Sequence, residues 1–86
     1  MIARNPRVIW DTVDDVLVLL HTETGEFFEL NDTAASAWNA SDGRSIAELA
    51  RLLQREYPGV ARRIVAEDCR ELVAVLVAHD LLQPVG

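Results

Sequence analysis

The order of hydrophobic and polar positions divides the chain into a strand-rich first third and a helical remainder. A first strand is predicted at residues 8–10, where β-branched and aromatic side chains follow Pro6. The continuous apolar run at residues 16–20 is typical of a central strand with little exposure on either face. The aspartates at 14–15 mark the turn before this run, and residues 22–25 form a hairpin loop after it.

A third strand is predicted at residues 26–30, which completes an antiparallel meander. Its alternation places Phe28 and Leu30 on one face of the sheet and Phe27 and Glu29 on the other. As the last strand of a meander it lies at an edge, with one row of backbone N–H and C=O groups unpaired. Proline and lysine, which commonly protect such edges, are absent from it. Either an extended peptide adds to this edge as a further strand, or a loop or a second copy of the protein covers it.

Three helices follow the strands. Asn31 or Asp32 is expected to cap the first helix, and Ser45 with Glu48 forms a capping box for the second. The third and longest helix is expected over about residues 60–79. The core positions of the second helix recur at helical spacing: Ile46, Leu49, Leu52, Leu53 and Tyr57.

Three strands followed by three helices predict an α+β domain that resembles a winged helix-turn-helix. Residues 81–82 are expected to pack after the last helix, and residues 84–86 to form a tail. At this length, residues 1–86 are expected to form a single domain with one core.

The third helix has an apolar arc wider than the roughly 100° stripe that packs on one surface. Either the helix is deeply buried among its neighbours, or part of the arc lines a groove. Asp68, at the edge of the arc, needs a partner in the fold or in a ligand. The arc and its flank comprise Ile64, Val65, Asp68, Cys69, Leu72, Val73, Val75, Leu76 and Val77.

Composition narrows the classes of function. The formal charge is −6, from 14 acidic and 8 basic residues. This balance disfavours binding to a nucleic-acid backbone and to anionic membrane surfaces. A single cysteine excludes an internal disulfide and fits a reducing cytosol. Because residues 1–10 do not read as a signal peptide and no apolar run is long enough to span a bilayer, we expect a cytoplasmic protein.

Residues capable of catalysis or metal binding are sparse. His21 and His79 do not have a metal-ligand spacing, and His79 is better explained as a residue at a helix C-terminus. Cys69 lies on the apolar arc, where a buried small hydrophobe is favoured over a nucleophile. The scattered glycines form no phosphate-binding loop. We therefore expect no catalytic residues, no metal site and no cofactor.

Taken together in order and spacing, several segments resemble PqqD-like proteins. The first part of the resemblance is the run at residues 25–31, followed by two alanines, a tryptophan and an Asp-Gly pair at residues 34–43. Asp80 departs from the pattern, because the family often has glycine before the final paired leucines. The resemblance spans about residues 8–82. Its later positions are Ile46, Leu49, Leu53, Tyr57, Asp68, Leu72, Leu76, Leu81 and Leu82.

This resemblance implies a RiPP recognition element, a winged-helix-like fold that binds the leader of a ribosomally made precursor peptide. The implied cleft lies between the third strand and the third helix. At this length the chain is most similar to the small recognition protein of lasso-peptide gene clusters, which works with a transglutaminase-like leader peptidase. The alternative within the family is a PqqD-type chaperone that presents its precursor to a radical enzyme.

The resemblance also implies which residues meet the peptide. One wall of the cleft is the strand edge from Glu26 to Leu30, and the other is the first half of the third helix. Polar contacts at the rim are expected from Arg62, Arg63 and Glu29. The implied peptide-binding set is Glu26, Phe27, Phe28, Glu29, Leu30, Ile64, Val65, Asp68, Cys69 and Leu72, with Arg62 and Arg63 at the rim.

Two functions of other classes stay open. A winged-helix nucleic-acid binder has a similar fold, and Arg62, Arg63 and Arg70 form a small basic patch. Glutamates interleave with that patch, which favours a solvated face instead. A thiol enzyme acting through Cys69 is the third hypothesis.

Overall fold

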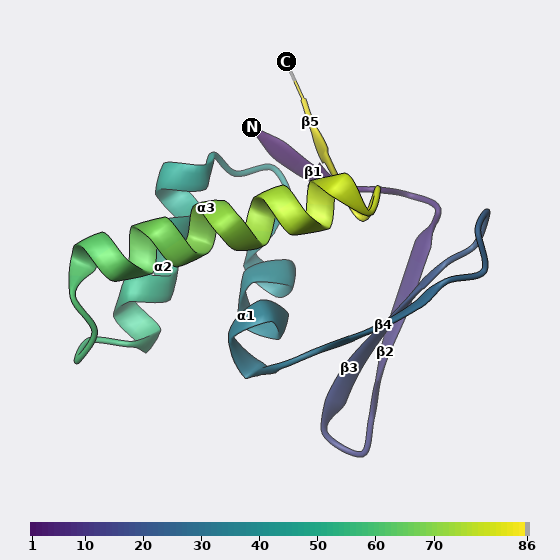
Figure 1. Ribbon diagram of the computed structural model, residues 1–86, viewed down its shortest axis with the longest axis horizontal. Coiled ribbons are helices and arrows are strands. Elements are labelled where there is room, and N and C mark those ends of the chain that lie inside the picture. Colours follow the sequence, from purple (N-terminus) through teal and green to yellow (C-terminus); the bar gives the residue numbers. More distant parts are fainter. Residues whose placement is uncertain (86) are drawn as a thin grey trace.

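The computed structural model describes residues 1–85, and its elements are arranged as in Figure 1. In chain order they are β1 (Ile2–Arg4), β2 (Val8–Val13), β3 (Val16–His21), β4 (Phe27–Leu30), α1 (Asp32–Ser41), α2 (Ile46–Glu56), α3 (Arg62–Ala78) and β5 (Leu82–Pro84). The predicted order of three strands and three helices is confirmed. None of the helices in residues 1–85 has the length and apolar character needed to cross a membrane.

The main sheet is an antiparallel meander in the order β2-β3-β4. Leu19 on the central strand lies between Trp10 on β2 and Phe28 on β4. Asp14 and Asp15 join β2 to β3, with φ angles of 51° and 64°. Two successive left-handed residues give a hairpin turn whose twist matches that of the strands. The predicted turn is therefore confirmed, although β2 extends past the predicted segment to Val13.

The two faces of the sheet differ in burial. On β3, Leu17 and Leu19 are buried, whereas Val18 and Leu20 on the opposite face are only half-buried. Ile9, on that same opposite face, is 56% exposed. The helices cover one face of the sheet only, so the prediction of a central strand buried on both faces is wrong.

The starts of the first two helices follow the sequence prediction. Asn31 caps α1, because its side-chain oxygen accepts a hydrogen bond from the Ala34 N–H at 2.9 Å. Ser45 and Glu48 form the predicted capping box, with distances of 3.1 and 3.3 Å. The Glu48 carboxylate accepts hydrogen bonds from the Ser45 N–H and the Ser45 hydroxyl, and these bonds lower the pKa of the Glu48 carboxyl. The start of α3 has no side-chain cap, and the helix begins at Arg62 instead of near residue 60.

A second, two-stranded sheet joins the ends of the chain, and the sequence analysis missed it. β1 and β5 pair antiparallel, with Ile2 opposite Pro84. The Val85 N–H donates to the Met1 carbonyl at 2.8 Å. The prediction of a tail is therefore wrong for residues 84 and 85, while Gly86 lies outside the described residues. Figure 1 shows the two short strands side by side, away from the main sheet.

The core lies between the helices and the inner face of the main sheet. Its largest fully buried apolar side chains are Trp38, Leu19, Leu49, Leu81 and Leu82. Trp38 packs edge-to-face against Trp10, with 5.4 Å between ring centroids. Side chains from α1, α2, β3 and the segment after α3 thus share one interior, which fixes the helices relative to the sheet.

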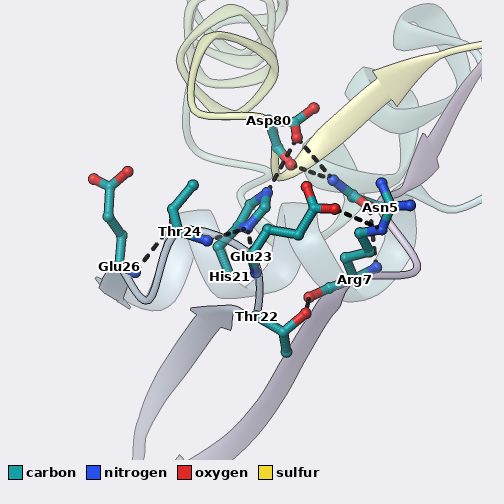
Figure 2. A network of polar contacts seen from close by, with 8 residues as sticks. All are labelled: Asn5, Arg7, His21, Thr22, Glu23, Thr24, Glu26 and Asp80. Atoms are coloured by element: carbon teal, nitrogen blue, oxygen red, sulfur yellow. Dashed lines mark hydrogen bonds and ion pairs between the residues drawn. The ribbon is translucent and has the colours of Figure 1, made fainter.

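A polar network fastens the end of α3 to the sheet (Figure 2). Asp80 Oδ2 lies 3.1 Å from Nε2 of the buried His21, and the Asn5 side-chain amide donates to the Asp80 carbonyl and carboxylate at 2.8 and 3.1 Å. The other ring nitrogen of His21 accepts from the Glu23 and Thr24 N–H groups. His21 therefore donates to Asp80 through Nε2. The network holds the end of α3 next to the loop that leads into β4.

Asp80 has the left-handed backbone, with φ 58°, that glycine usually supplies after a helix. We expect Asp80→Ala to lower the free energy of unfolding by about 2 kcal/mol, because the variant loses charged hydrogen bonds and keeps the strained backbone. Asp80→Gly loses the same bonds but relieves the backbone, so its loss should stay below about 1 kcal/mol. Urea denaturation measures both values. Wild-type stability in Asp80→Ala would contradict this account of the network.

Candidate functional site

The outer edge of β4 carries unpaired backbone groups. β4 is the last strand of its sheet, and no strand formed by residues 1–85 adds to it. The His21 N–H donates to the Glu26 carbonyl at 3.0 Å. This bond determines which β4 residues hydrogen-bond to β3 and which do not. Because backbone groups alternate along an antiparallel pair, the N–H and C=O of Phe27 and Glu29 face away from β3. This edge therefore offers two donors and two acceptors to another extended chain.

The side chains of β4 alternate as predicted. Phe28 and Leu30 are half-buried against the core, and Phe27 is 70% exposed. The Phe28 ring lies 5.1 Å from the ring of His79, which is the C-cap residue of α3. This contact places the start of β4 beside the end of α3. The prediction that His79 is a C-terminal helix residue is confirmed.

A small pocket of about 120 Å³ lies beyond the other end of β4, where the start of α1 faces the first half of α3. Thr33 from α1 lines it, three residues after the last residue of β4. Known ligand pockets of drug size are about 300–1,000 Å³, so this pocket suits a single side chain better than a compact ligand. Its lining is Thr33, Leu53, Tyr57, Val60, Val65, Asp68, Cys69 and Leu72.

Four of the five α3 residues predicted for the cleft wall are thus brought together: Val65, Asp68, Cys69 and Leu72. The fifth, Ile64, is 40% exposed and does not line the pocket. The residues that α1, α2 and the following loop contribute to the pocket were not predicted from the sequence. Tyr57 was read only as a core position, although its hydroxyl lies 3.4 Å from the Thr33 hydroxyl at the pocket.

Arg62 and Arg63, the two arginines predicted at the rim of the cleft, lie away from the pocket. Arg63 pairs with Glu67, one turn along α3, at 3.3 Å. Arg62 lines a different groove, between α2 and α3. Neither arginine lines the pocket described above.

The pocket combines apolar walls with one carboxylate. Asp68 is exposed and makes no hydrogen bond or ion pair within residues 1–85. Its carboxylate is therefore available to an N–H donor or a basic side chain of a ligand. Two features explain why the apolar arc of α3 is so wide. Val65, Val73 and Leu76 are buried in the core, and part of the arc lines the pocket.

Cys69 is a packed side chain in this pocket wall. It is 1% exposed, and its Sγ lies 3.9 Å from the Ile46 carbonyl oxygen. Burial raises the pKa of the Cys69 thiol, so the thiolate is scarce at neutral pH. The prediction of a buried small hydrophobe is confirmed. No group of three or more potential metal ligands occurs among the described residues.

Comparisons with known proteins identify the family of the chain and two structures with a similar fold. A family model described as coenzyme PQQ synthesis protein D (PqqD) matches residues 17–82. The structure of TbiB1 in complex with the TbiA(beta) leader peptide is similar, with a TM-score of 0.85, 28% identity and 98% of each chain covered. A lasso peptide synthetase B1 complexed with the leader peptide has a TM-score of 0.81 and 33% identity, over 96% of this chain and 98% of that one. A search of curated proteins finds no match.

The raised pKa of the Cys69 thiol predicts slow alkylation of the folded protein. Each unit of pKa lowers the thiolate fraction about tenfold, and burial also blocks access of the reagent. We expect iodoacetamide at pH 7.5 to label the folded protein at least about tenfold more slowly than the urea-unfolded protein, as followed by intact mass. Equal rates in the two states would show that Cys69 is an accessible, reactive thiol.

Proposed function

The chain belongs to the PqqD family, and from this premise we propose that it binds the leader segment of a ribosomally made precursor peptide and presents it to a modifying enzyme. One observation carries the proposal. The unpaired edge of β4 lies in a fold whose two solved relatives are both complexes with a leader peptide. The relatives cover nearly the whole chain, so the likeness includes both proposed walls of the cleft.

The leader binds by β-strand addition at the edge of β4. Phe27 and Glu29 supply two N–H donors and two carbonyl acceptors to the incoming strand. Each backbone hydrogen bond contributes a net of about 1 kcal/mol, whereas association costs at least about 4 kcal/mol. The ladder alone therefore gives weak binding. Side-chain anchors must supply the remaining affinity and the specificity.

The pocket between α1 and α3 supplies that anchor. A single apolar or aromatic side chain of the leader fits a volume of about 120 Å³, against Val65, Cys69 and Leu72. Asp68 accepts from a donor on the same leader residue or its neighbour. Phe28 and Leu30 pack against the core and support the strand edge from the inner side. The Glu26 carbonyl accepts a hydrogen bond from the His21 N–H just before the strand. Ile64, Arg62 and Arg63 stay predicted contacts for parts of the leader that extend past the pocket, although Arg62 also lines the separate groove between α2 and α3.

The partner enzyme in this proposal is a leader peptidase of the transglutaminase-like class, acting in lasso-peptide biosynthesis in the cytoplasm. The relative with 33% identity, a lasso peptide synthetase B1, favours this pathway over a radical enzyme of the PqqD type. The domain itself performs no bond-making step. It raises the effective concentration of the precursor at the enzyme, because binding converts a bimolecular encounter into one within a complex.

Proline at position 29 tests the strand-addition step. Glu29→Pro removes an N–H that faces away from β3, so the existing ladder is kept while one donor to the leader is lost. We expect at least about tenfold weaker binding of a fluorescent synthetic leader peptide that binds the wild-type chain, measured by anisotropy. The lost donor, the proline ring at the interface and the altered strand geometry all weaken binding of the leader.

Glu29→Ala is the matched control, because it removes the carboxylate and keeps the N–H. It should change the affinity for the leader by no more than about threefold, the range expected for an exposed charge. Circular dichroism of both variants verifies the fold. If Glu29→Pro is folded and binds the leader as tightly as Glu29→Ala, the leader does not pair with this edge.

A further inference from the structure

A second and larger groove, of about 760 Å³, lies between α2 and α3. Ile46 and three alanines, including Ala66 from α3, form its apolar part. The guanidinium groups of Arg51, Arg55, Arg62 and Arg70 come from both helices that border it. None of the lining residues is shared with the leader pocket. The two sites therefore use different faces of α3.

The charge of this groove contrasts with that of the whole chain. All 8 basic residues are arginines, and the net charge is −6. Arg4, Arg7 and Arg63 each pair with an acidic side chain. The four groove arginines form no ion pair within residues 1–85. Glu48, which is close in sequence to Arg51, is bonded to Ser45 in the capping box.

We propose that this groove docks an acidic amphipathic helix carried by the modifying enzyme. The inference rests on the proposed function, because presenting a bound leader requires a second surface that stays free when the cleft is occupied. The inference states where the enzyme docks on this chain and what kind of segment the enzyme uses to bind there.

The spacing of the arginines fits a helix. At 1.5 Å per residue, Arg62 and Arg70 lie about 12 Å apart along α3, and Arg51 and Arg55 about 6 Å apart along α2. Carboxylates at one-turn spacing on a docked helix match such a spread, and each forms paired hydrogen bonds with a guanidinium group. A small anion would instead need donors that converge on one point. The alanines leave room for the close approach of another helix.

One further polar atom in the lining lacks a partner. Gln54 donates through Nε2 to the Tyr57 and Val60 carbonyls at 3.2 and 2.9 Å. Its Oε1 is buried without a hydrogen-bond partner among the described residues. Because this oxygen is buried, a serine or threonine hydroxyl on the docked helix reaches it only when the Gln54 amide turns toward the groove.

Nucleic acid fits the groove less well. The same two helices carry Glu48, Glu56, Glu67 and Glu71, which are all exposed. Duplex DNA presents a phosphate charge about every 1.7 Å along its axis, so a bound duplex brings phosphates against these carboxylates. An isolated acidic helix meets only the arginines within the groove.

The test uses a synthetic helix of about 20 residues, long enough to be partly helical alone, with alanines on one face and glutamates at i and i+4. A copy with glutamine in place of each glutamate is the neutral control. NMR titration of the full chain should give shifts confined to α2 and the first half of α3. The acidic helix should bind at least about tenfold more tightly than the neutral copy.

Three single variants complete the test. Arg55→Glu and Arg70→Glu should each weaken binding of the acidic helix, and of the modifying enzyme that acts on the bound precursor, at least about tenfold. Arg44→Glu changes the charge equally at an exposed arginine outside the groove, and should bind both partners as the wild type does. The affinity for the leader should stay within about twofold of wild type in all three variants. The proposal for the groove can therefore fail while the proposal for leader binding holds, and the reverse.

Several outcomes would overturn the inference. Equal affinity for the acidic and neutral helices would remove the role of the arginines. Undiminished enzyme binding in both groove variants would place the docking surface elsewhere. Tighter binding of a duplex of about 20 base pairs, lost in the same two variants, would assign the groove to nucleic acid.

Discussion

A strand at the edge of a sheet exposes half of its backbone hydrogen-bonding groups, and in this chain that constraint falls on Phe27 and Glu29. Loops, prolines or lysines commonly protect such an edge, but β4 has no proline or lysine and only Glu29 is charged, so the edge stays open. Water satisfies the exposed groups in the free protein. Another extended chain can replace that water at little net cost, which makes the edge suited to reversible binding of many related sequences.

The rest of the fold holds this edge in a fixed relation to α3. Phe28 packs against His79, and the buried His21 donates to Asp80 at the end of the same helix. Asn5 adds a third segment to this arrangement. The proposed cleft therefore has, at one end, side chains distant in sequence that fix the strand to the helix, and at the other end the pocket around Asp68. The opposite flank of α3 stays free for a second partner, so one helix serves both proposed surfaces.

Local patterns predicted most of the fold. The hairpin turn at Asp14 and Asp15, the cap at Asn31 and the capping box at Ser45 depend on residues within three or four positions of each other. The alternation of β4 depends only on the strand period. These features need no knowledge of the tertiary structure, which is why the meander, the helices and the open edge could be expected from the sequence.

Features that depend on distant partners could not be predicted in this way. The pairing of Ile2 with Pro84 joins the two ends of the chain, and neither short segment has a strand pattern of its own. The resemblance implied Arg62 only as a rim contact, and its place in the groove between α2 and α3 depends on how those two helices pack. Tyr57 has the spacing of a core residue, and only the approach of Thr33 from α1 places it at the pocket.

Amide hydrogen exchange at β4, followed by NMR with and without a saturating leader peptide, tests the central claim most directly. In the free protein, the Phe27 and Glu29 amides should exchange rapidly, while those of Phe28 and Leu30 should be protected by pairing with β3. Added leader should protect Phe27 and Glu29 as well. Protection of both amides before the leader is added, or no change at saturation, would contradict the account.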